Sequence, residues 1–175
     1  MKTANKKYLN PVLSALFSAF IAVCSQITVV LPSGIPLTLQ SFAVILCGYV
    51  LGVKWSAAAV TVYLLTGLCG IPVFSSFGAG PYFFAGPTGG FLIGFLPLCI
   101  LCSLSLKFKK RLFSILFSLF ALLLFYFIGT IWYCVVTGTP FISGFLVAVT
   151  PFIPKDILCA FTALFVAFRI KRKIC

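Results

Sequence analysis

"KFKKRLFSILFSLFALLLFYFIGTIWYCVV", residues 107–136, places four basic residues directly before a long apolar run. The run from 112 to 136 has no charged residue, and it exceeds the roughly 20 apolar residues that a helix needs to cross a bilayer. Lysine and arginine are retained preferentially on the cytoplasmic side of such spans. The stretch therefore predicts a transmembrane helix that begins at the cytoplasmic face.

The rest of the chain repeats this pattern of basic islands and apolar runs. Hydrophobic residues make up 62% of the 175 positions and charged residues 8%, which is outside the range of soluble domains. We expect an all-α integral membrane protein, multi-pass in the cell (plasma or inner) membrane, with residues 1–175 forming a single transmembrane domain. A chain of this length has room for about six spans. They are predicted at 9–30, 37–52, 55–70, 89–106, 112–136 and 150–168.

The basic islands predict the orientation of these spans. Thirteen lysines and arginines against one acidic residue give a net charge of +12. The islands are the N-terminal lysines, Lys54, 107–111 and 169–173, and all fall on one side if both termini are cytoplasmic. Charges arranged in this way favour membrane orientation over nucleic-acid binding. The three outer connections, 31–36, 71–88 and 137–149, are uncharged and rich in glycine, proline and aromatic residues.

The first span has two features that the sequence leaves open. Basic residues before an apolar run that ends near Cys24 also fit a signal peptide, but Val23 occupies the position where a lipoprotein cleavage site has a small residue. We therefore favour an uncleaved span. Its small residues form two rows spaced four apart, which suit either internal packing or docking of a partner helix. The rows contain Ser14, Ala15, Ser18, Ala19 and Ala22.

Eight cysteines raise the alternative of a membrane enzyme. Cys99 and Cys102 form a C-x-x-C pair, but they fall near the cytoplasmic end of the fourth predicted span, in a reducing compartment. The chain has no histidine, which removes the usual partner for metal binding and acid–base chemistry. We interpret the cysteines as small apolar residues in helix interfaces. No enzymatic activity, metal site or cofactor is expected.

Asp156, the only acidic residue, lies in "PFIPKDILCA" (151–160), near the outer end of the sixth predicted span. An ionisable residue at membrane depth is a functional-site candidate. The structural alternatives are an ion pair with Lys155 or a helix cap. Adjacent helical residues point about 100° apart, so we expect a direct pair to be awkward and both side chains to address a third body. With Thr38, Gln40 and the aromatic outer connections, these residues predict a site for a small, mostly apolar anion that enters from outside.

Four blocks of the chain resemble, in order, the motifs of the BioY family, the S components of energy-coupling-factor (ECF) biotin transporters. The blocks are "GIPLTLQSFAVILCGYVLG" (34–52), "YLLTGLCGIPVF" (63–74), "GPTGGFLIGF" (86–95) and "PFIPKDILCA" (151–160). The resemblance covers nearly the whole chain. It implies six helices with cytoplasmic ends and biotin, taken up across the membrane, held near the outer surface.

The resemblance also implies partners and residue roles. Family members are driven by a membrane scaffold subunit and two ATP-binding subunits, and Ala15 and Ala19 match the row where such subunits dock. Asp156 matches the acid that accepts hydrogen bonds from the biotin ureido group. Thr38, Gln40 and Tyr82 are further candidate biotin contacts. No Walker-type nucleotide loop occurs in the chain, so ATP dependence has to come from other subunits.

The sequence departs from the family pattern beside Asp156. The family lysine three residues after the aspartate is Cys159 here, and the family glycine before it is Lys155. Positions 155 and 159 lie one helical turn apart. We hypothesise that Lys155 receives the biotin carboxylate in place of the missing lysine. The alternatives are an S component for another small anionic vitamin and an ion-coupled carrier that uses Asp156 as a protonatable group.

Overall fold

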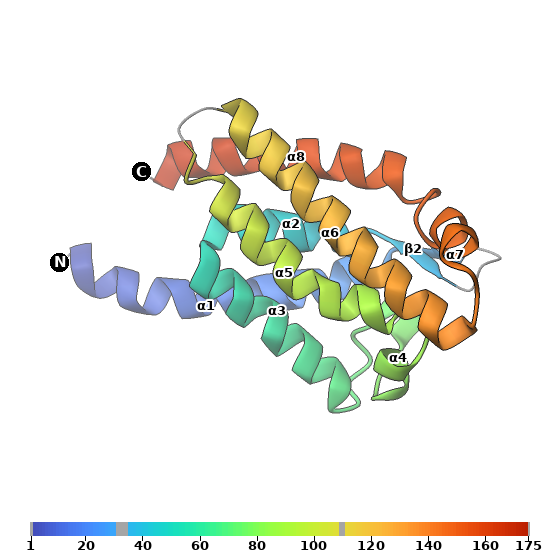
Figure 1. The fold of residues 1–175 in the computed structure, drawn as a ribbon. Helices are drawn as coiled ribbons and strands as arrows, with labels where there is room; N and C mark the ends of the chain where they lie inside the picture. Colours follow the sequence, from blue (N-terminus) through green and yellow to red (C-terminus); the bar gives the residue numbers. More distant parts are fainter. Residues whose placement is uncertain (1, 31–34, 109–110, 175) are drawn as a thin grey trace.

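The computed structural model describes residues 2–30, 35–108 and 111–174, and these are mostly helical (Figure 1). The long helices are α1 (Lys2–Gln26), α2 (Gln40–Leu51), α3 (Val53–Leu68), α5 (Gly89–Ser105), α6 (Arg111–Thr137) and α8 (Ile153–Ile174). The short elements are β1 (Thr28–Val30), β2 (Pro36–Thr38), the 3₁₀ turn η1 (Ser75–Phe77), α4 (Tyr82–Ala85) and α7 (Phe141–Ala148).

Each long helix corresponds to one predicted span, but the helices differ in length. Tyr8–Gln26 of α1 and Leu112–Thr137 of α6 are long and apolar enough to cross a membrane. α7 and α8, joined through a 55° bend, qualify as a third span when taken together. α2, α3 and α5 are apolar helices of 12, 16 and 17 residues. The fold is therefore that of a helical membrane protein, and the six-span topology remains a prediction.

The structure shifts several predicted helix boundaries and adds a small two-stranded hairpin to the helical architecture. α1 ends at Gln26, and Thr28–Val30 pairs antiparallel with Pro36–Thr38 to form a small hairpin. Three consecutive residues, Thr28, Val29 and Val30, are β-branched and favour an extended backbone, so the first helix does not continue to residue 30. The second helix likewise begins at Gln40 rather than at 37. Of the predicted connection 31–36, residues 31–34 lie outside the described part.

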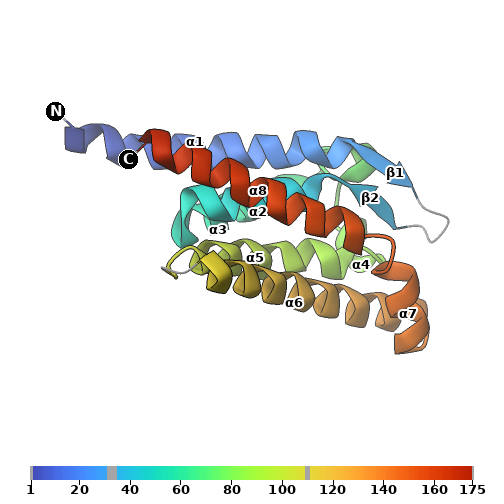
Figure 2. The ribbon, with the colours of Figure 1, turned by 90° about the horizontal axis from the view of Figure 1, so that it is seen from above.

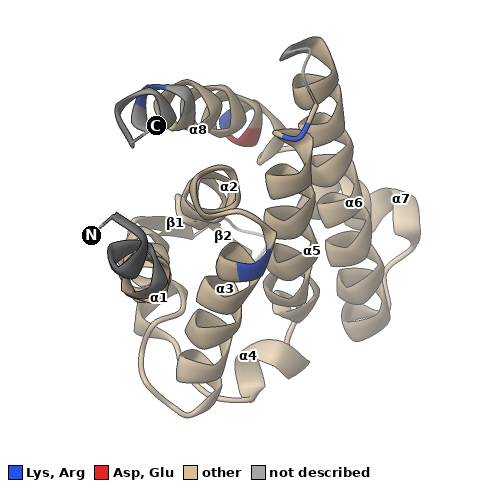
Figure 3. Ribbon diagram, turned by 90° about the vertical axis from the view of Figure 1, so that its left-hand side faces the viewer, with Lys and Arg blue, Asp and Glu red and all other residues tan. Residues whose placement is uncertain are grey.

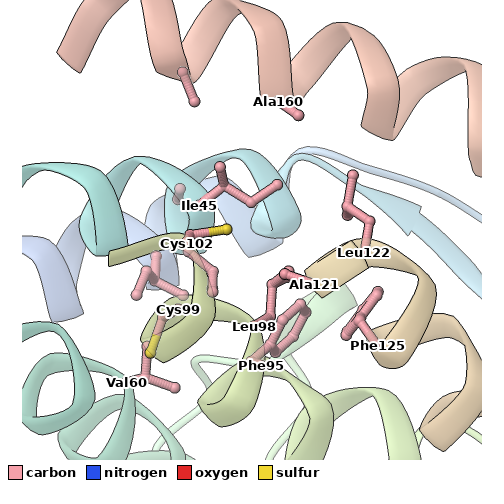
Figure 4. Close-up of a cluster of buried hydrophobic side chains, with 14 of the residues drawn as sticks. Ile45, Val60, Phe95, Leu98, Cys99, Cys102, Ala121, Leu122, Phe125 and Ala160 are labelled. Atoms are coloured by element: carbon pink, nitrogen blue, oxygen red, sulfur yellow. The ribbon is translucent and has the colours of Figure 1, made fainter. Parts of the chain in front are cut away.

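The central element of the bundle is α2. It packs against α1, α3, α5 and α8, and nine of its twelve residues are buried. The view from above shows α1 and α6 on opposite sides of the bundle, with α2, α3 and α5 between them (Figure 2). Figure 4 shows part of the shared core, which contains Ile45, Val60, Phe95, Leu98, Leu122 and Ala160. The start of α2 is consequently held on several sides, which fixes the polar residues there.

Of the four basic residues whose side chains are described, three gather at one end of the bundle, and the fourth, Lys155, lies near the other end, in the first turn of α8. Lys54 begins α3, Lys107 follows α5, and Arg169 lies in the last turns of α8. Figures 1 and 3 place these points at the end where both chain termini lie. The hairpin, α4 and α7 lie at the opposite end. The charge asymmetry predicted from the sequence is therefore present in the folded chain.

The contact between α5 and α6 depends on glycine. A side chain added at Gly90 would overlap Trp132 and approach the carbonyl oxygen of Ile128. We predict that Gly90→Val lowers the thermal unfolding midpoint of the detergent-solubilised protein by about 3–10 °C, because overpacking a helix contact costs roughly 1–3 kcal/mol. Ile93→Val is the control, since it places valine at an exposed position of the same helix. Equal midpoints for the two variants would contradict close α5–α6 packing at Gly90.

Candidate functional site

A cavity of about 570 Å³, counting the space that opens to solvent, lies at the end of the bundle that carries the hairpin. The walls are mainly apolar and aromatic: Ile35, Phe74, Phe83, Phe91, Phe95, Phe125 and Phe152. The polar lining comprises Thr38, Gln40, Ser41, Ser75, Thr88, Tyr126, Lys155 and Asp156. An apolar chamber with a few clustered polar groups suits a small amphipathic ligand.

Asp156 is the centre of the polar cluster. The residue is 1% exposed, and both carboxylate oxygens are hydrogen-bonded. Ser41 Oγ donates to Oδ1 at 2.5 Å, and Tyr126 Oη donates to Oδ2 at 2.8 Å. The described hydrogen bonds of this carboxylate include none from a backbone N–H of α8, so they do not make it a helix cap. They connect α8 to α2 and α6.

Lys155 and Asp156 form a direct ion pair, contrary to the expectation from their adjacent positions. The ammonium Nζ lies 2.7 Å from Asp156 Oδ1, and the lysine side chain is 17% exposed. Nζ also donates to the carbonyl oxygen of Thr38 at 2.6 Å and to Ser41 Oγ at 2.8 Å. The expectation was wrong because it considered only the direction of the Cα–Cβ bonds. A flexible four-carbon stem in the first turn of a helix reaches its neighbour regardless.

Gln40 presents a free acceptor to the same cavity. Its Nε2 donates to Tyr63 Oη at 2.6 Å, and Tyr63 in turn donates to the carbonyl oxygen of Val73 at 3.2 Å. Because the tyrosine proton is used on Val73, the amide has to turn its NH₂ toward Tyr63. Gln40 is 4% exposed, and among the described residues no donor reaches its Oε1. Because Gln40 lines the cavity, this oxygen is available to accept a hydrogen bond from a ligand.

Two other predicted residues have different positions. Thr38 lines the cavity, and its carbonyl oxygen, rather than its hydroxyl group, holds the Lys155 ammonium. Tyr82 does not line the cavity: it is 79% exposed, and its ring lies edge-on against Phe83. Phe83 supplies the aromatic surface at this position. Because α4 is a single turn, neighbouring residues on it point to different sides, which the sequence does not resolve.

The two rows of small residues on α1 separate into a buried row and an exposed row. Ser14 and Ser18 are buried, and Ser14 Oγ donates to the carbonyl oxygen of Trp55 on α3 at 3.0 Å. Ala15 and Ala19 are exposed. The serine row accounts for internal packing, and the alanine row is available to a partner.

Sequence reasoning missed Ser41 and Tyr126. Ser41 bridges Lys155 and Asp156, since it accepts a hydrogen bond from one and donates to the other. Tyr126 carries a polar group within the longest predicted span, 112–136. A hydroxyl group at that depth needs a hydrogen-bond partner. The presence of a tyrosine in this span was therefore the sequence feature that could have indicated a polar contact.

The C-x-x-C pair lies within the hydrophobic core. Cys99 and Cys102 are fully buried among apolar side chains of α2, α3 and α5 (Figure 4). All seven cysteines whose placement is described are free thiols. No group of three or more potential metal ligands occurs in the described part of the chain.

Comparison with known proteins identifies the family. The family model for BioY matches residues 1–174. The chain belongs to the BioY family. It is 41% identical over 159 residues to "Probable biotin transporter BioY" of Pyrococcus horikoshii, covering 91% of this chain and 94% of the relative. It is 37% identical over 159 residues to "Biotin transporter BioY2" of Lactococcus lactis, covering 89% and 86%.

A solved structure supports the same assignment. The crystal structure of the S-component for biotin from an ECF-type ABC transporter matches with a TM-score of 0.88 at 25% identity, covering 97% of this chain and 94% of that one. In this BioY chain, each of the four recognised sequence blocks contributes to the cavity, through Gln40, Phe74, Phe91 and Asp156 respectively. The family motifs are thus far apart in sequence and adjacent in space.

Proposed function

We propose that this chain is a biotin transporter, the S component that captures biotin in the cavity around Asp156 for uptake across the membrane. Its known relatives are transporters and not enzymes. The observation that carries the proposal is a buried carboxylate, Asp156, and an amide, Gln40, that line the same aromatic cavity. Biotin has the complementary chemistry: two N–H donors on a rigid ureido ring, attached to an apolar thioether ring and chain.

The hydrogen-bond capacity of the cluster supports a ureido contact. A carboxylate has about four acceptor positions, and Asp156 uses three of them on Ser41, Lys155 and Tyr126. One position remains at Oδ2, which accepts a single internal bond. Gln40 Oε1 supplies a second acceptor. The two ureido N–H groups are assigned to these two oxygens, and the phenylalanine walls take the bicyclic ring and the chain.

Orientation in the membrane follows from the charge distribution. Apart from Lys155, the basic residues whose side chains are described, Lys54, Lys107 and Arg169, lie at the end of the bundle opposite the cavity. The positive-inside rule puts that end in the cytoplasm, which leaves the cavity facing outward. We propose six spans, α1, α2, α3, α5, α6 and α8, with both termini cytoplasmic in the plasma membrane, and one transmembrane domain over the whole chain.

We assign the energy source for biotin uptake to partner subunits. The resemblance to an S-component of an ECF-type transporter supports assembly with a scaffold subunit and two ATP-binding subunits. The exposed alanines on α1, Ala15 and Ala19, are the proposed docking row, because small residues let helices approach closely.

Calorimetry on the purified, detergent-solubilised chain tests the function directly. We expect biotin to bind with a Kd of about 1 µM or tighter, which corresponds to roughly 8 kcal/mol or more. Desthiobiotin, which keeps the ureido ring but lacks the sulfur, is expected to bind as well, whereas valeric acid is expected to give no heat. Absence of biotin binding would contradict the proposal and would favour another small anionic vitamin as the ligand.

A further inference from the structure

We propose that Lys155 is the fixed counter-ion of Asp156, and that the biotin carboxylate remains near the cavity mouth without a cationic partner. This inference rests on the proposed function and specifies how the same site selects its ligand. It predicts that the ureido end of the molecule determines recognition, while the carboxyl end tolerates neutral derivatives.

The donors of Lys155 are the first argument. A protonated amine has three N–H groups, and the ammonium of Lys155 has three close acceptors within the protein. They are Thr38 O at 2.6 Å, Asp156 Oδ1 at 2.7 Å and Ser41 Oγ at 2.8 Å. The ring of Phe152 lies 5.8 Å from the same nitrogen. A ligand carboxylate would have to displace one of these partners, and displacing Asp156 would leave that buried carboxylate without its counter-ion.

The charge balance of the cavity is the second argument. Lys155 and Asp156 are the charged residues among those that line it, and their charges cancel. Residues 31–34, next to the hairpin, add no charge by sequence. A carboxylate that entered such a neutral, mostly apolar chamber would lose its hydration without gaining an opposite charge. It is therefore more stable at the solvent-open side, with the ureido ring inside.

Position 159, where the family has a lysine, supplies no other cation for the biotin carboxylate. Cys159, one turn beyond Lys155 on α8, is buried and does not line the cavity. A change from lysine to cysteine at this position therefore removes a charge from α8, and Lys155 does not replace it. The ammonium group of Lys155 pairs with Asp156 instead.

The test compares biotin with biotin methyl ester by calorimetry on the wild type, Lys155→Met, Lys155→Arg and the control Lys54→Met. Lys54 is an exposed lysine outside the cavity. We expect the wild type and Lys54→Met to bind the two ligands within about threefold of each other. Lys155→Met is expected to weaken both ligands by the same factor, about tenfold or more, because Asp156 loses its counter-ion. Lys155→Arg should recover most of the affinity for both.

Each outcome has a defined meaning. A wild-type preference for biotin over the ester of about 30-fold or more that disappears in Lys155→Met would make Lys155 the carboxylate receptor and overturn this inference, while the proposed function stands. A preference that persists in Lys155→Met would show that another group binds the carboxylate, which also overturns it. Unchanged affinity of both ligands in Lys155→Met would overturn the counter-ion role. If Lys155→Met does not fold, the ratio of biotin affinity to methyl ester affinity in the wild type and in Lys155→Arg decides whether Lys155 binds the carboxylate. Binding of neither ligand by the wild type would instead contradict the proposed function.

Discussion

Asp156→Ala is expected to abolish measurable biotin binding, with a loss of about 1,000-fold or more. The substitution removes the acceptor assigned to one ureido N–H, and it also leaves the partly buried Lys155 ammonium without its counter-ion. Breaking a buried ion pair from one side costs roughly 3–5 kcal/mol. Ser41 and Tyr126 lose their acceptor as well. The cavity is thereby changed in charge and in shape at the point where the ligand head is proposed to bind.

Calorimetry with purified variants measures this effect, and two further substitutions define its cause. Asp156→Asn keeps one oxygen acceptor and nearly the same volume, so we expect an intermediate loss of about 30–300-fold. Thr162→Ala, on the exposed side of the same helix, is the control, because its hydroxyl group bonds only to the backbone of α8. It should bind as the wild type does. Biotin affinity within threefold of the wild type in folded Asp156→Ala would remove Asp156 from the proposed site.

The elements of the fold that depend on hydrophobic runs and charge islands could be predicted from the sequence. Each of the six predicted runs contains a long helix, because an apolar stretch of this length leaves the backbone no better way to satisfy its hydrogen bonds in a membrane. The hairpin was missed, since Thr28–Val30 is as apolar as the helix before it. Hydropathy does not distinguish a short strand from a helix end. Only the β-branched side chains carried that information.

The sequence was sufficient to predict the charged residue at the centre of the site, but not the residues that contact it. A lone carboxylate in an apolar span, Asp156, pointed to the site. The ion pair with Lys155 depends on rotamers, and the bridge through Ser41 depends on the packing of α2 against α8, so neither follows from spacing along one helix. Tyr82 and Phe83 are adjacent in sequence, yet only Phe83 lines the cavity. The direction of a side chain on a one-turn helix is set by the tertiary contacts of that turn.

Tryptophan at positions 15 and 19 of α1 is expected to separate biotin binding from biotin uptake. Ala15 and Ala19 are exposed and are not among the residues that line the cavity, so the double variant Ala15→Trp/Ala19→Trp should bind biotin within about threefold of the wild type. Uptake of labelled biotin, in cells that also produce the scaffold and ATP-binding subunits, should fall by about tenfold or more. Overpacking one close helix contact costs roughly 1–3 kcal/mol, and here two positions are overpacked.

The control for this experiment uses the opposite side of the bundle. Leu123 of α6 is exposed, and α6 lies away from α1 (Figure 2), so Leu123→Trp adds an indole to the surface without touching the proposed docking row. Its uptake should match that of the wild type. If both tryptophan variants transport normally, the alanine row is not the docking surface. If uptake by the wild type needs no ATP-binding subunit and follows the proton gradient, the chain acts as an ion-coupled carrier, and Asp156 is then the group to examine for proton coupling.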